Sequence, residues 1–69
     1  MIWYDEEELE RLNGWDPNDV GELFEEKKTG KVFELREVDV RLRKVWLESD
    51  DEMVCADVED LPRSKFWYA

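Results

Sequence analysis

The stretch KVFELREVDVRLRKVWL, residues 31–47, alternates apolar and charged side chains and therefore predicts β-structure. The alternation begins with Phe33 and Leu35 at odd positions. It changes to even positions near residues 36–37 and returns to odd positions near residues 43–44. A one-residue slip turns every side chain to the other face of a sheet, so each change marks a turn or a β-bulge. We predict a turn at 36–37 and a bulge at 43–44.

On the C-terminal side, Ser49-Asp50-Asp51-Glu52 reads as a polar hairpin loop, and apolar residues alternate again in the segment that follows it. Asp60-Leu61-Pro62 interrupts this segment, because proline cannot donate to a strand ladder. The predicted strands are residues 31–36, 38–48, 53–59 and 65–68.

On the N-terminal side, the sequence predicts a first helix over residues 5–13. Asp5 is a favoured N-cap, and Glu8 stands three residues later at capping-box spacing. Asn13-Gly14 suits a left-handed stop.

A second helix is predicted over residues 17–28. Asp16 caps it, Pro17 takes the favoured first position, and Gly30 stops it. Its buried stripe is predicted to consist of Val20, Leu23 and Phe24.

These elements predict a single α+β domain over residues 1–69, the length of one small domain. Two N-terminal helices precede a strongly bent antiparallel sheet of about four strands. The bent sheet is SH3-like by analogy of architecture alone, and that analogy implies no function.

The composition argues against an enzyme. The chain has no histidine, and its single cysteine, Cys55, is expected to be a buried structural residue among acidic neighbours. The adjacent acids Asp50, Asp51 and Glu52 lack the ligand spacing of a calcium loop. We therefore predict no catalytic residues, no metal and no cofactor.

No apolar run approaches the ~20 residues of a membrane span, and the N-terminus lacks the basic start and apolar stretch of a signal peptide. The prediction is a cytoplasmic protein that does not bind membranes.

The charge is the most informative feature. The net charge is −10, distributed as −7 over residues 1–30, +2 over 31–47 and −5 over 48–69. Such a surface repels nucleic acid and attracts basic partners. The sequence predicts a small acidic binding protein that engages a basic surface, such as that of a nucleic-acid-binding protein, and modulates or inhibits it by mimicking nucleic acid.

The candidate partner-binding residues are Glu6, Glu7, Glu10, Glu22, Glu25, Glu26, Asp50, Asp51, Glu52 and Trp46. Three alternatives remain. The acids can form a purely solvated face, or the domain can be a structural or accessory module that docks through exposed aromatics. Trp46 is the candidate anchor for such docking, because Val45 and Leu47 share the opposite face of their strand. The least favoured alternative is a hydrolase that uses paired carboxylates.

Overall fold

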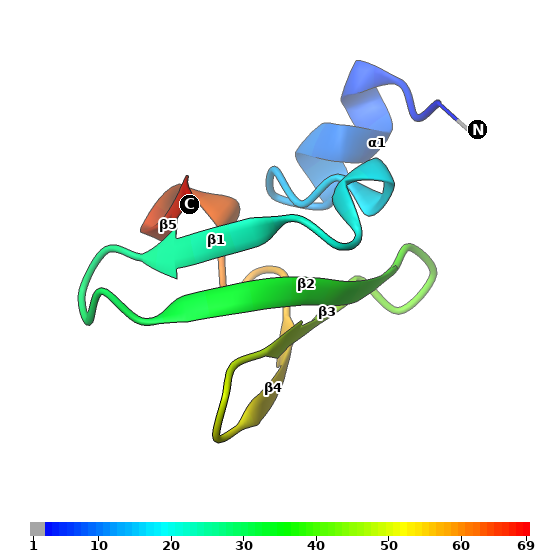
Figure 1. Ribbon diagram of the computed structural model, residues 1–69. Helices are drawn as coiled ribbons and strands as arrows, with labels where there is room; N and C mark the ends of the chain where they lie inside the picture. Colours follow the sequence, from blue (N-terminus) through cyan, green and yellow to red (C-terminus); the bar gives the residue numbers. More distant parts are fainter. Residues whose placement is uncertain (1–2) are drawn as a thin grey trace.

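The computed structural model describes residues 3–69 as a five-stranded antiparallel sheet with one short α-helix and two 3-10 turns (Figure 1). The strands are β1 (Leu23–Glu26), β2 (Val32–Asp39), β3 (Lys44–Glu48), β4 (Met53–Asp57) and β5 (Phe66–Tyr68). The helical elements are α1 (Glu6–Arg11), η1 (Pro17–Asp19) and η2 (Arg63–Lys65). The strand order is β4-β3-β2-β1-β5, so the last strand returns to pair with the first. The prediction of an α+β domain with two N-terminal helices and about four strands is wrong.

The helix α1 begins at the predicted cap and ends earlier than expected. The Asp5 carboxylate accepts a hydrogen bond from the Glu8 backbone N–H at 2.8 Å. Arg11 lies in the last turn, where a cation opposes the helix dipole favourably. The chain leaves the helix through Asn13 and Gly14, both at positive φ, as glycine and asparagine permit.

The predicted helix over residues 17–28 does not form. Asp16 acts as a cap, since its carboxylate accepts a hydrogen bond from the Asn18 backbone N–H at 2.8 Å. The turn η1 nevertheless stops at Asp19, and Gly21 then takes a φ of 98° that redirects the chain. The start signal is thus used for a single 3-10 turn.

Residues 23–26 instead form β1, which pairs with β2 on one side and β5 on the other. Hydrogen bonding on both sides outweighs the weak helix preference of so short a segment. Of the predicted buried stripe only Phe24 is buried, while Val20 and Leu23 are exposed.

The bulge and the turn lie in the reverse order to the prediction. The predicted turn at 36–37 is a β-bulge, because β2 runs through it and its pairing with β3 shifts between Leu35 and Glu37. The predicted bulge at 43–44 is the end of the β2–β3 turn, where Arg43 has a φ of 53°. A bulge and a turn each displace the alternation by one residue, so the alternation does not distinguish them.

The hairpin loop at 49–52 links β3 to β4, and the Ser49 N–H donates to the Glu52 carbonyl at 2.8 Å. The strand β4 ends at Asp57 rather than at residue 59, and β5 begins at Phe66 rather than at residue 65.

The core lies between one face of the sheet and the segments that precede β1 and follow β4. Trp15 is fully buried, and its Nε1–H donates to the Leu61 carbonyl at 2.6 Å. Its ring meets Phe24 and Phe66 edge-on at centroid distances of 5.5 and 5.2 Å. The buried residues are Leu12, Trp15, Phe24, Phe33, Leu35, Val38, Val45, Leu47, Val58 and Phe66. This packing leaves the opposite, outer face of the sheet bare within residues 3–69.

Candidate binding surface

The outer face of the sheet consists of the side chains that alternate with the core residues, and none of them is buried. The register arranges them in four rows across the strands. The rows are Trp67–Glu25–Val32, Leu23–Glu34–Glu48–Met53, Glu37–Trp46–Cys55 and Asp39–Lys44–Asp57.

Three apolar side chains gather at one end of the outer face, over β5, β1 and β2. Trp67 is 53% exposed, Leu23 46% and Val32 44%. Single exposed apolar residues are normal on protein surfaces. Large contiguous apolar patches mark interaction sites, and here three exposed apolar residues fall within two neighbouring rows, with Glu25 between Trp67 and Val32.

Acidic side chains predominate around this apolar group, although the Lys27 ammonium lies over the Trp67 ring. In the four rows, carboxylates outnumber basic groups six to two once the bulge residue Arg36 is included. Arg36 lies 2.7 Å from Glu34 through its Nη1. The hydrogen bond to Glu34 and the charge of Glu48 raise the pKa of Arg36. Lys44 lies 3.8 Å from Asp57. The outer face keeps an excess of negative charge after these pairs.

A groove of about 470 Å³ opens on this face between the β1–β2 pair and the β3–β4 loop. Its volume is in the range of ligand sites. It is lined by Leu23, Val32, Glu34, Glu48, Ser49 and Asp50. The groove therefore combines an apolar wall with three carboxylates.

The predicted acids of the N-terminal half do not form one helical cluster. Glu6, Glu7 and Glu10 are exposed on α1, which packs on the core side of the sheet through Leu12. The other three acids lie outside any helix: Glu22 precedes β1, whereas Glu25 and Glu26 are in it. Only Glu25 belongs to the outer face.

Of the three predicted acids in the hairpin loop, only one belongs to the groove on the outer face. Asp50 lines the groove, whereas Asp51 and Glu52 each lie 2.8 Å from the Lys31 Nζ. The hydrogen bonds to these two carboxylates raise the pKa of Lys31 to about 12. The hydrogen bond from Lys31 lowers the pKa of Asp51. Two of the three loop acids are thus engaged within the chain.

Trp46 lies on the outer face and is half-buried between Glu37 and Cys55 in its row. Of the predicted partner-binding residues, Trp46 and Glu25 thus lie on the outer face and Asp50 lines its groove. The expectation of a buried Cys55 is wrong, because the outer-face side of β4 carries no covering layer in the described chain and Cys55 is exposed.

Sequence reasoning missed the groove residues Leu23, Val32, Glu34 and Glu48 and the neighbouring Trp67. The signal for Trp67 was the alternation in the last strand. Trp67 directly follows the core residue Phe66, so its side chain lies on the opposite face of the sheet. The signal for Leu23 was hidden by the helix start at Asp16-Pro17, which assigns residue 23 to a helix stripe.

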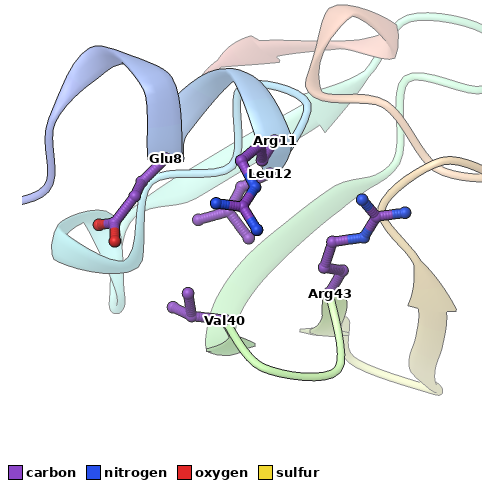
Figure 2. A pocket seen from close by; sticks show the side chains of 5 residues that line it. All are labelled: Glu8, Arg11, Leu12, Val40 and Arg43. Atoms are coloured by element: carbon purple, nitrogen blue, oxygen red, sulfur yellow. The ribbon is translucent and has the colours of Figure 1, made fainter.

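A second hollow lies between α1 and the β2–β3 turn (Figure 2). Its volume is about 130 Å³, below the few hundred Å³ of typical ligand sites. Figure 2 shows Glu8 and Arg11 on the helix side and Val40 and Arg43 on the turn side, with Leu12 behind. Arg43 is paired with Glu59. This hollow is therefore too small to be a candidate ligand site.

Within residues 3–69, the cysteine and the carboxylate side chains do not assemble into a group of three or more that could hold a metal ion. The one α-helix in these residues has neither the length nor the apolar character for a membrane crossing.

Comparison of the chain with protein families, curated proteins and solved structures finds no match.

Proposed function

We propose that this chain is a binding protein whose outer sheet face docks a basic segment of a partner protein. One observation carries the proposal. The exposed apolar residues Leu23, Val32 and Trp67 share a face with an excess of carboxylates, and an acid-lined groove opens beside them.

The two kinds of side chain serve different parts of recognition. Apolar contact supplies most of the affinity at protein interfaces, and complementary charge steers the encounter and fixes the orientation. Lysine and arginine have long apolar stems that cover apolar surface while their charged ends reach carboxylates. A segment rich in lysine or arginine, with some apolar residues, matches both features of this face.

The partner we propose is a basic protein surface of the kind that nucleic-acid-binding proteins present. Mimicry of regularly spaced phosphates is not part of this proposal, because the second helix that was to space the carboxylates does not form. Trp46 lies two residues from Glu48 on the same face, in the next row, and provides an aromatic anchor beside the groove.

The test is a titration with two synthetic peptides, one alternating lysine with leucine and one alternating lysine with serine. Amide chemical shifts of the protein report the site. We expect the lysine–leucine peptide to shift the amides around Leu23, Val32 and Glu48. The lysine–serine peptide should bind about tenfold more weakly, a difference of ~1.4 kcal/mol, because it offers charge without apolar contact.

Matched variants separate the groove from net charge. Leu23→Thr with Val32→Thr removes the apolar wall, and Glu48→Gln with Asp50→Asn removes two groove charges. Each double variant should weaken the lysine–leucine peptide about tenfold. Glu6→Gln with Glu7→Gln changes the net charge equally, at exposed positions on α1, and should leave the affinity nearly unchanged in salt that screens distant charges. Equal losses in both charge variants, or no saturable binding of either peptide, would refute the proposal.

A further inference from the structure

A hollow of about 510 Å³ lies on another part of the molecule, between the β1–β2 turn and η2. The two segments are joined by a backbone hydrogen bond from the Lys27 N–H to the Lys65 carbonyl at 2.9 Å. The hollow is lined by Glu26, Lys27, Lys28, Leu61, Ser64 and Lys65. The fold thus brings three of the five lysines of the chain to one place.

The charge of this hollow is opposite to that of the protein. Lys27, Lys28 and Lys65 take part in no ion pair within the described chain, although the sequence has twenty acidic residues for ten basic ones. The one carboxylate in the lining, that of Glu26, accepts a hydrogen bond from the Thr29 hydroxyl at 2.6 Å. Neighbouring like charges repel one another. An anion between them removes that repulsion.

The lining also holds apolar surface and one hydroxyl. Leu61 is half-buried against the core, and Ser64 supplies a hydroxyl donor. Lys27 also makes a cation–π contact outside the lining, because its ammonium lies over the Trp67 ring at 5.2 Å. Ligand sites of this size are typically apolar with a few convergent polar groups.

We propose that the hollow of Lys27, Lys28 and Lys65 binds a small organic oxyanion, a carboxylate or phosphate carried on an apolar group. The ammonium groups bind the anionic oxygens as point charges, and Leu61 contacts the apolar group. This site shares no lining residue with the outer-face groove, although Lys27 contacts Trp67 of the same face, and it does not depend on the function of the groove.

The test uses phenyl phosphate, benzoate and uncharged benzyl alcohol as probes, followed by amide chemical shifts. Both anions should give saturable shifts at Lys27, Lys28, Ser64 and Lys65. Phenyl phosphate should bind more tightly if phosphate is the preferred group, and benzoate if carboxylate is. Benzyl alcohol should give no saturable shift.

The variant Lys27→Gln with Lys65→Gln should weaken the better anion at least tenfold. Arg11→Gln with Arg41→Gln is the matched control, because both arginines are exposed and the net charge changes equally. Lys28→Gln alone, at an exposed turn residue, gives a second reading if the double lysine variant is unfolded. The proposal is overturned by shifts that do not saturate, by equal losses in both double variants, or by equal binding of benzyl alcohol.

Discussion

At the scale of single residues, Arg63 joins the N-terminal and C-terminal segments of the domain. Its backbone N–H donates to the Asn13 carbonyl at 3.1 Å, and its Nη1 donates to the Phe66 carbonyl at 2.6 Å. Its guanidinium carbon lies 4.4 Å from the ring centres of both Phe24 and Tyr68. The flat guanidinium therefore packs in the aromatic cluster as a structural group.

Close packing against Arg63 makes Gly14 sensitive to substitution. Gly14 has a φ of 88°, and an added Cβ would lie 2.8 Å from the Arg63 Cβ. We expect Gly14→Ala to lower the free energy of unfolding by about 2–3 kcal/mol, through the strained backbone and the contact together. Urea denaturation of the variant and the unmodified protein measures this difference in the free energy of unfolding. Gly30→Ala is the control, since it shares a positive φ of 74° but has open space, and should cost only about 1 kcal/mol. Equal costs would show that the contact with Arg63 is unimportant.

The cluster of Lys31, Asp51 and Glu52 predicts a pH dependence. The folded-state pKa of Asp51 is lowered below 3.8, so its pairing stabilises the fold above that value and is lost as pH falls through the folded pKa. The pKa of Lys31 is raised from 10.5 to about 12, so its contribution is present below pH 10.5 and is lost as pH rises through about 12. In a carbon-detected NMR titration, Lys31→Gln should raise the Asp51 pKa toward its ordinary range, although the hydrogen bond from Ser49 still lowers it. Lys44→Gln removes a cation from another ion pair and should leave the Asp51 pKa unchanged. If Lys31→Gln also leaves it unchanged, Lys31 is not the cause of the lowered Asp51 pKa.

At the scale of elements, the bulge at Arg36 predicts an asymmetry between two single-residue deletions. Without Arg36 the strand reads Phe33, Glu34, Leu35, Glu37, Val38, which alternates regularly and keeps the observed pairs with β3. Deleting Arg36 should therefore leave a folded chain with a lower urea midpoint, because only the local bend is lost. Deleting Glu34 instead turns one half of β2 to the wrong face and should abolish cooperative unfolding. A folded Glu34 deletion, or an unfolded Arg36 deletion, would contradict the register.

The elements also show what the sequence could predict. Alternation located the strands around Phe33, Leu47 and Val54, and the capping residue Asp5 located the start of α1, because these signals are local. The conformation of residues 23–26 could not be read locally. It depends on pairing with residues 32–34 on one side and 66–68 on the other. Hydrogen bonds to these distant strands outweigh the local helix preference of the segment.

The candidate surface could likewise be predicted only in part, because it too depends on contacts between distant segments. The acids were visible as composition, but the groove that joins Leu23 to Glu48 and Asp50 exists only because β1, β2 and the β3–β4 loop meet. The same holds for Lys27 and Lys65, which are brought together by the β1–β5 side of the sheet.

At the scale of the whole molecule, a net charge of −10 is confined to a body of 31 × 23 × 19 Å. Its ion pairs are exposed and stabilise little, whereas the general repulsion acts over the whole body. We expect the urea midpoint to rise as NaCl reaches about 0.1–0.2 M, where the Debye length is ~8–10 Å. Choline chloride should raise the urea midpoint by a similar amount if the cause is screening of the negative charges. A midpoint that falls with salt would show that the ion pairs outweigh the repulsion.

The return of β5 to β1 has a consequence for synthesis on the ribosome. The partner of Glu26 in this ladder is Phe66, forty residues later. At a synthesis rate of about 5–20 residues per second, Phe66 is added roughly 2–8 s after Glu26. During this interval the nascent chain keeps one edge of β1 open, and Trp15 lacks the Phe66 ring that later covers it. The sheet therefore closes only after β5, the last of the five described strands to be synthesised, pairs with β1.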